Sequence, residues 1–380
     1  MKVKAGTYSK LAHRILLAVA SGAPLILVTD DQIFSPLREQ DRYEAVVKAQ
    51  PSLEGQANLT LLSHRLIQYD EQQGFVTSDI ASLARGNTLA FIKKVEEQCD
   101  RKTATGFITC ANNILGHLFY YKPSNTVADA WANRYSDCDL NSYLLMDVMY
   151  RAGFKPSIVY SPGHAFISFI DENGNIYFQE TTENNNMGNK ADMTDSFYIK
   201  TLPGFYYQPQ DAAFSEKLYP ILTTSKLTEK NGQQLATNMF SMWPNNPLVQ
   251  DVFYHYRNPL TAADAEQLRS LLATDISSSI KRTTLARYYQ QKGDIDEAVS
   301  YLEKIDDAMC SDSCLELKAD NHVEYKIILF IKKHLREGVT VSMIKNTFVH
   351  IIIWYIALIL TALILPGTGW WITRLREKAE

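Results

Sequence analysis

The sequence places a single cysteine, Cys138, between two aspartates in the stretch RYSDCDLNSYLL, residues 134–145. A polar segment changes there into an apolar run with helical spacing, which predicts a helix that stops at Gly153. Ser136 is the predicted N-cap, with Asp139 three residues later as the capping-box acid. Cys138 then lies in the first helical turn, where the helix dipole and unpaired backbone amides favour the thiolate. We therefore predict a reactive thiol.

A thiol that attacks an amide also needs a base to take and return its proton, and a third group to orient that base. His164 opens one predicted strand and Glu180 lies near the end of the next, with Asn173-Gly174 as the hairpin turn between them. In that register Ile167 pairs approximately with Glu180. Glu180 therefore reaches His164 only if the strands slip or the side chains lean diagonally.

The segments DCDLNSYLLMDVMYRAGF, PGHAFISF and YFQETT resemble the core of the transglutaminase-like superfamily, a circularly rearranged papain-like fold of thiol enzymes. The resemblance covers about residues 130–185. It implies that Cys138 is the nucleophile, that His164 is the general base and acid, and that Glu180 orients the histidine. Attack would give a thioester, which water resolves in a peptidase or amidase and an amine resolves in a transglutaminase. We expect hydrolysis of a protein or peptide substrate, without a cofactor.

Two points about this site stay open at the level of sequence. The backbone amide of Cys138 is one expected oxyanion donor, and either Trp131 or Tyr135 could supply the second. Each proposed catalytic residue also has a purely structural interpretation. Cys138 could be a small buried residue, His164 a strand-edge histidine and Glu180 a solvated strand terminus. The alternative function is accordingly a non-catalytic membrane scaffold that binds a protein partner.

The other four cysteines fall into two close pairs, Cys99 with Cys110 and Cys310 with Cys314. This spacing predicts two local disulfides and leaves one cysteine unpaired, as in a thiol enzyme of an oxidising compartment. A zinc site at Cys310, Cys314 and His322 is an alternative, although its spacing matches no strong zinc pattern and a fourth ligand is missing. Five reduced thiols in a cytosolic protein are a second alternative.

Apolar runs near both ends of the chain predict membrane attachment. Residues 348–365, FVHIIIWYIALILTALIL, carry no formal charge and are long enough to cross a bilayer as a helix. Residues 15–28 lie between a basic and an acidic flank, which favours an uncleaved signal anchor over a cleavable signal peptide. We expect an inner-membrane protein whose catalytic domain is periplasmic or otherwise extracytoplasmic. A cytosolic protein anchored by its C-terminal tail is the alternative.

The charge composition limits the classes of binding partner that we expect. The 380 residues carry 38 Lys and Arg against 42 Asp and Glu, a net charge of -4, and the basic residues are scattered. Without a basic stripe, nucleic-acid binding is not expected. Residues 283–306 resemble one tetratricopeptide unit, so a helical repeat region could bind a protein partner or buttress its neighbour.

Together these patterns predict an α+β protein. Its expected parts are a transglutaminase-like (papain-like) core of helix plus antiparallel sheet, an α-helical repeat-like domain and a C-terminal transmembrane helix. The predicted boundaries are 1–34 for the anchor, 35–225 for the thiol enzyme domain, 226–340 for the tetratricopeptide-like domain and 346–372 for the C-terminal span.

Overall fold

The computed structural model describes residues 31–334, 343, 346 and 349–357. Helices make up 62% of these residues and strands 7%. The chain forms two compact units, one of Tyr43–Lys318 and one of Met1–Arg42 with Ala319–Glu380. Each unit is described by itself.

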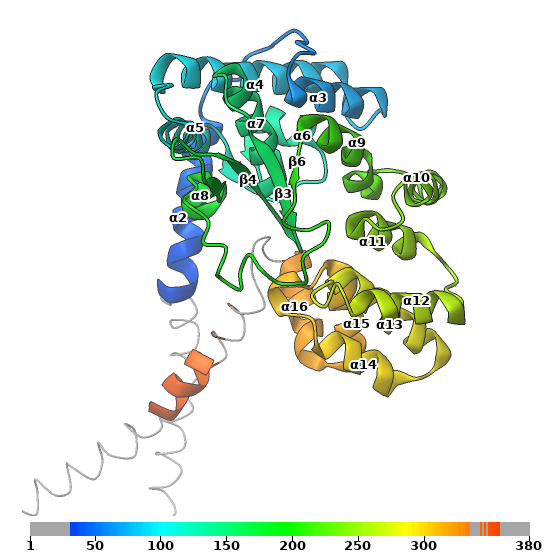
Figure 1. The fold of residues 1–380 in the computed structure, drawn as a ribbon. Helices are drawn as coiled ribbons and strands as arrows, with labels where there is room; N and C mark the ends of the chain where they lie inside the picture. Colours follow the sequence, from blue (N-terminus) through cyan, green and yellow to red (C-terminus); the bar gives the residue numbers. More distant parts are fainter. Residues whose placement is uncertain (1–30, 335–342, 344–345, 347–348, 358–380) are drawn as a thin grey trace, which may run out of the picture. The chain divides into compact units, whose positions relative to one another are not determined.

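Helices account for most of the larger unit (Figure 1). In chain order they are α3 (Leu62–Gln72), α4 (Ser78–Gln98), α5 (Ala104–Leu118), α6 (Val127–Ala132), α7 (Cys138–Arg151), α8 (Glu183–Asn186), α9 (Ala212–Leu222), α10 (Glu229–Met242), α11 (Pro247–Tyr256), α12 (Ala262–Leu272), α13 (Ser279–Lys292) and α14 (Ile295–Glu303). Helices α2 (Asp31–Lys48) and α15 (Asp312–Asn321) each cross the boundary between the units, and α16 (Val323–His334) belongs to the smaller one.

This architecture overturns the predicted fold class. The α+β fold with a transglutaminase-like, papain-like core is wrong, because the described residues form a predominantly helical protein in which that core is not seen. The motif that suggested it covers little more than α7 and one β-hairpin. Residues 62–132 fold as four helices, and residues after 211 are again mostly helical. A short motif does not specify how the rest of a chain packs, because packing depends on contacts between segments far apart in sequence.

A small antiparallel sheet lies against α7 (Figure 1). Its strand order is β5-β4-β3-β6, from β5 (Ile176–Gln179), β4 (His164–Ile170), β3 (Ser157–Ser161) and β6 (Pro209–Gln210). A separate parallel pair joins β1 (Tyr120–Tyr121) to β2 (Tyr135–Ser136), just before α7. The start of α7 and the start of β4 are therefore both anchored to regular structure.

The core of the larger unit surrounds α7. Its biggest fully buried side chains include Trp131 on α6, Tyr143 on α7 and Phe91 on α4. The α4 helix comes close to an upstream loop at Gly86, where an added Cβ would lie 1.7 Å from the carbonyl oxygen of Leu53. Glycine is thus required at this contact.

The C-terminal part of the larger unit is a series of helices with its own buried ion-pair cluster. Helices α13 and α14 are joined at Gly293, whose φ of 81° is left-handed. Lys281 on α13 is fully buried, and its Nζ donates to Asp251 Oδ1 at 2.7 Å and to Asp275 Oδ2 at 2.8 Å. This pairing satisfies a charge that burial alone would make costly.

No described helix is both long enough and apolar enough to cross a membrane. The expected C-terminal transmembrane helix at 346–372 is therefore not seen among the described residues, which there comprise only 346 and 349–357. Of the predicted anchor at 1–34, all but residues 31–34 lie outside the described residues.

Candidate active site

Cys138 is the first residue of α7, but its helix is capped differently from the prediction. The N-cap is Asp137, whose Oδ1 accepts a hydrogen bond from the Leu140 backbone N–H at 3.4 Å. Ser136 belongs instead to β2, where it is buried and pairs with Tyr121. The Ser136 cap was wrong because pairing with an upstream strand, which the local sequence does not reveal, withdraws that residue from the helix start.

The electrostatic surroundings of the Cys138 thiol are also different from the expectation. Burial raises the pKa of the thiol, and the neighbouring carboxylates of Asp139 and Asp137 raise it further. A hydrogen bond from the Ala165 backbone N–H lowers this pKa in part. The net shift favours the protonated thiol. Cys138 therefore needs a base at the moment of attack, because the helix dipole alone does not hold it as a thiolate.

A base and its orienting acid are in direct contact close by. His164 Nε2 and Glu180 Oε2 are 2.6 Å apart, and both side chains are almost fully buried. In the β-hairpin Ile167 pairs with Gln179, so the register differs by one residue from the prediction. Glu180 lies just past the end of β5, and its backbone pairs with Asn189. Its side chain can therefore turn back toward the first residue of β4.

The second oxygen of the Glu180 carboxylate has its own donors. Oε1 accepts from the backbone N–H groups of Thr181 and Thr182 and from the Thr182 hydroxyl, each at 2.8 Å. Burial raises the pKa of Glu180, but the hydrogen bonds from His164 and Thr182 outweigh it and the pKa is lowered. An ionised Glu180 holds the proton of the His164 ring on Nε2. Nδ1 is then the nitrogen that can accept a proton.

Several contacts tie the nucleophile candidate to this pair. The Thr181 hydroxyl donates to the Cys138 carbonyl oxygen at 3.3 Å, and Asn141 Nδ2 donates to the Thr181 carbonyl oxygen at 3.0 Å. The thiol faces the backbone N–H of Ala165, the residue after His164. Among the described residues, no hydrogen bond joins the thiol to the imidazole ring. The fold thus brings the three predicted residues to one region, without a thiol–imidazole hydrogen bond among the described residues.

Both predicted oxyanion donors are engaged elsewhere. Trp131 Nε1 donates to Ser136 Oγ at 3.4 Å, and the Tyr135 hydroxyl donates to Asp129 Oδ2. A third aromatic residue, Tyr121, was missed by the sequence reasoning. Burial raises the pKa of its phenol, and negative charge on Cys138, on Asp137 and on Glu180 raises it further.

Aromatic rings enclose the imidazole of His164. The centroid of its ring is 5.5 Å from that of Phe197, 6.0 Å from that of Phe166 and 6.2 Å from that of Tyr198. Burial raises the pKa of Tyr198, and the adjacent charge of Glu180 contributes. Phe197 and Tyr198 come from an irregular segment after β5, so only tertiary structure reveals that they belong to the site.

The polar stretch after β5 is partly buried against the start of α7. Asn186 is fully buried, its Nδ2 donates to the Phe119 carbonyl oxygen at 3.0 Å, and its Oδ1 accepts from Asn141 Nδ2 at 3.0 Å. An added Cβ on Gly188 would lie 1.8 Å from the Glu180 carbonyl oxygen. This stretch therefore supports the position of Glu180.

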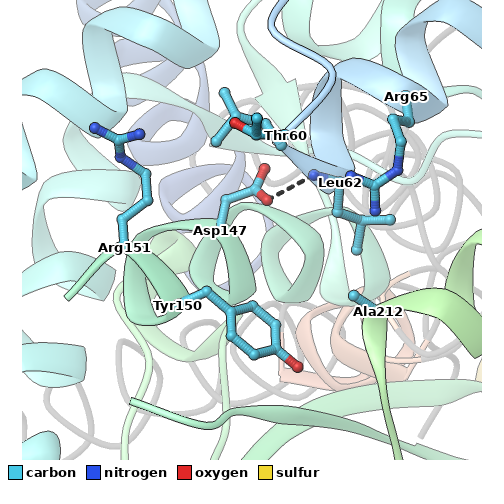
Figure 2. A pocket seen from close by; sticks show the side chains of 8 residues that line it. Thr60, Leu62, Arg65, Asp147, Tyr150, Arg151 and Ala212 are labelled. Carbon is cyan, nitrogen blue, oxygen red and sulfur yellow. Dashed lines mark hydrogen bonds between the residues drawn. The ribbon is translucent and has the colours of Figure 1, made fainter. Parts of the chain in front are cut away.

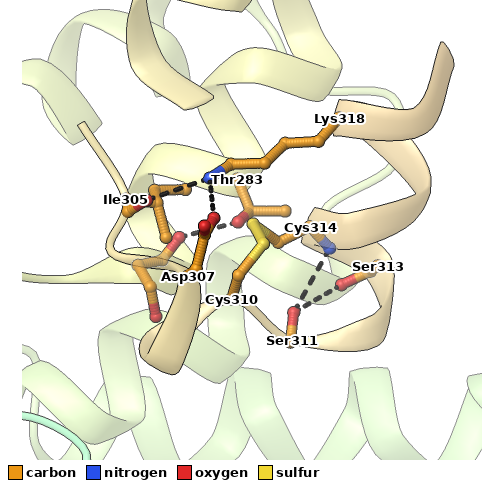
Figure 3. Close-up of a disulfide and its surroundings, with 9 residues drawn as sticks. Thr283, Ile305, Asp307, Cys310, Ser311, Ser313, Cys314 and Lys318 are labelled. Carbon is orange, nitrogen blue, oxygen red and sulfur yellow. Dashed lines mark hydrogen bonds and ion pairs between the residues drawn. A yellow bond between two sulfur atoms is a disulfide. The ribbon is translucent and has the colours of Figure 1, made fainter. Parts of the chain in front are cut away.

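The structure contains both predicted disulfides, Cys99–Cys110 and Cys310–Cys314, and leaves Cys138 as the free cysteine. Figure 3 shows the second disulfide beside Lys318, whose Nζ donates to Asp307 Oδ1 at 3.0 Å. With both sulfurs bonded to each other, the alternative zinc site at this position is not formed. No cluster suited to a metal ion occurs in the part of the chain that the structure describes.

A cavity of about 230 Å³ is lined by Asp147, Tyr150 and Arg151 in the C-terminal half of α7 and by residues of other segments (Figure 2). Asp147 lines it and accepts from the backbone N–H groups of Leu62 and Ser63 at 2.7 and 3.0 Å. Burial raises the pKa of Asp147 to about 6, against the opposing effect of these hydrogen bonds. The Asp147 carboxylate thus satisfies backbone N–H groups at the start of α3. None of the residues that line this cavity belongs to the candidate active site.

Comparisons with known proteins leave the family of this chain open. No family model matches the sequence, and no curated protein matches it. The chain is similar to a solved structure of menin, described as revealing the binding site for Mixed Lineage Leukemia (MLL) protein. The TM-score is 0.45 with 10% identity, covering 79% of this chain and 77% of that one. A likeness at this TM-score supports no argument about function.

Proposed function

We propose that this protein is a cysteine hydrolase, a peptidase or amidase, whose catalytic residues are Cys138, His164 and Glu180. The observation that carries the proposal is the buried 2.6 Å contact between His164 Nε2 and Glu180 Oε2, beside a free cysteine at a helix start. An oriented base next to an unpaired thiol is the arrangement that nucleophilic catalysis needs.

In the proposed reaction, Cys138 Sγ attacks the carbonyl carbon of the substrate while the thiol proton passes to His164 Nδ1. The carboxylate of Glu180 stabilises the imidazolium that forms. The imidazolium then protonates the leaving amine as the carbon–nitrogen bond breaks, which leaves a thioester on Cys138. Water, deprotonated by the imidazole, cleaves the thioester and releases the acid.

The raised pKa of Cys138 decides how this mechanism starts. Because burial and two carboxylates favour the protonated thiol, His164 must act as a general base during attack. Substrate binding would draw the thiol and Nδ1 together, as catalytic hydrogen bonds often tighten only in the complex.

The two disulfides support an oxidising compartment for this enzyme, because such bonds persist mainly outside the cytosol. We retain a periplasmic or otherwise extracytoplasmic location as part of the proposal. A protein or peptide is the proposed substrate, and a protein partner could bind the helical region α10–α14.

A non-catalytic scaffold is the second candidate function. The observations that favour it are the raised pKa of the thiol and the missing thiol–imidazole hydrogen bond among the described residues. In that case His164 and Glu180 would serve as a buried pair that fixes the hairpin. Labelling at Cys138 separates the two functions.

The test uses p-nitrophenyl acetate as a generic acyl donor and follows acetylation of Cys138 by mass spectrometry of acid-quenched samples. We expect a transient acetyl thioester in the wild type, none in Cys138→Ala, and acylation slowed by about 10²- to 10⁴-fold in His164→Ala. His117→Ala changes an exposed histidine and is the matched control. If Cys138 is not acetylated, or if His164→Ala acylates at the wild-type rate, the enzyme proposal fails and the scaffold remains.

A further inference from the structure

Lys200, a lysine of the segment that packs against His164, differs from the two buried lysines of the larger unit in making no direct ion pair among the described residues. Lys200 is half-buried, and no ion pair to it occurs among the described residues. By contrast, Lys281 pairs with two carboxylates, and Lys318 pairs with Asp307 at 3.0 Å. Lys281 and Lys318 are thus held by direct ion pairs, whereas Asp306 acts on Lys200 through its charge without such a pair among the described residues.

The backbone around Lys200 is held firmly. The Lys200 and Thr201 N–H groups donate to the Tyr207 hydroxyl at 2.8 and 3.1 Å. Tyr207 is itself joined to β3, because its N–H donates to the Tyr160 carbonyl oxygen at 2.9 Å. The Thr201 hydroxyl also donates to the Thr274 carbonyl oxygen at 2.8 Å. The lysine is thus positioned by the strand next to the one that carries His164.

Its side chain extends toward the site. Lys200 Nζ is 4.8 Å from the centroid of the Phe197 ring, and that ring makes an edge-on contact with His164 at 5.5 Å. Burial lowers the pKa of Lys200, and the charges of Asp306 and Cys138 partly oppose this. The ammonium therefore lies on the aromatic wall that packs against His164.

Exposed apolar side chains flank Lys200 in the chain. Phe197 is 52% exposed and Leu202 is 56% exposed, and Ile199 lies between them in the chain with 38% exposure. A partly desolvated cation beside exposed apolar side chains favours a ligand that has an anionic group next to apolar groups.

We propose that Lys200 is a specificity residue that binds an anionic group of the acyl donor close to the reacting carbonyl, so that the enzyme prefers acidic peptides with apolar neighbours. This inference rests on the proposed function for its substrate, but its electrostatic basis is independent of hydrolysis. A carboxylate bound at Lys200 would form the ion pair that the free protein lacks there.

The test compares alkylation of Cys138 by anionic iodoacetate and neutral iodoacetamide in the folded full-length protein. Alkylation displaces iodide by the sulfur and requires neither His164 nor hydrolysis. The readout is the rate constant for iodoacetate divided by the rate constant for iodoacetamide. We expect Lys200→Gln to lower this ratio about fivefold to tenfold, and Lys200→Glu to lower it further, because a nearby unit charge changes the local potential. Lys190→Gln is the matched control, since Lys190 lies 5.4 Å over the Tyr177 ring and is exposed.

An unchanged ratio in Lys200→Gln would overturn the inference, and so would a failure of both reagents to alkylate Cys138 in the folded protein. A lower ratio of iodoacetate to iodoacetamide alkylation in Lys200→Gln, together with intact acetylation by p-nitrophenyl acetate, would support the inference. The proposed function fails separately, when acetylation of Cys138 is absent or independent of His164. Near-ultraviolet circular dichroism of each variant checks that the fold is retained.

Discussion

Replacing Glu180 with glutamine tests the centre of the proposed site. The carboxylate accepts four hydrogen bonds, one from His164 and three from Thr181 and Thr182. A glutamine has a single acceptor oxygen, so that oxygen must stay with the threonine donors. Its amide NH2 then faces His164 Nε2 and donates to it. The ring proton then moves to Nδ1, and a protonated Nδ1 can no longer accept the proton of the thiol.

Two magnitudes follow from this geometry. Losing a charge-assisted hydrogen bond of a buried pair should lower the free energy of unfolding by about 1.5–3 kcal/mol. Losing the correct tautomer of the base should slow acetylation of Cys138 by about 10²- to 10⁴-fold. Urea unfolding monitored by circular dichroism measures the first, and acetyl transfer from p-nitrophenyl acetate measures the second.

The stability difference should also depend on pH. The pKa of Glu180 is lower in the folded protein than in the unfolded chain, so its contribution is complete above the unfolded value of about 4.3 and is lost as pH falls through the folded value. The difference in the free energy of unfolding between wild type and Glu180→Gln should therefore be largest at neutral pH and should disappear in acid. Glu183→Gln, an exposed neighbour, is the control. Wild-type acetylation in Glu180→Gln, or a gap that does not change with pH, would refute the role assigned to this carboxylate.

Three further predictions concern the surroundings of the site and the helical region. Lys281→Met should lower the free energy of unfolding by about 3–5 kcal/mol in urea titrations, because it leaves buried carboxylates unpaired; a loss below 1 kcal/mol would contradict this. Asp139→Asn should speed iodoacetamide labelling of Cys138 at neutral pH, because that carboxylate raises the pKa of the thiol; an equal or slower rate would count against it. Gly188→Ala should cost about 1–3 kcal/mol in thermal melts, because its Cβ would overlap the Glu180 carbonyl oxygen; an unchanged melting temperature would show that the loop can adjust.

Local patterns predicted several local elements correctly. The helix that begins at Cys138, the left-handed Gly153 after it and the hairpin turn at Gly174 are all present. The two disulfides are present as well. These features depend on residues a few positions apart, whose own conformational preferences are strong.

Other features failed because distant segments decide them. The thiol was expected to favour its ionised form, yet burial by the packed segments raises its pKa, and the carboxylates of its chain neighbours Asp139 and Asp137 add to this shift. Trp131 and Tyr135 were expected near the oxyanion, yet both donate to other residues. Desolvation and hydrogen-bond partners are properties of packed surfaces, and spacing along the chain does not report them.

The sequence by itself determined the residue types of the candidate site, the order of helix and hairpin that carries them and the pairing of the close cysteines. Only the tertiary structure decided that the protein is mainly helical, that Glu180 turns back onto His164, and that Phe197 packs against His164 with Lys200 over its ring. The physical reason is the range of the interactions. Helix starts, tight turns and short disulfide loops are governed by neighbours in the chain, whereas burial, charge pairing and aromatic enclosure are governed by neighbours in space.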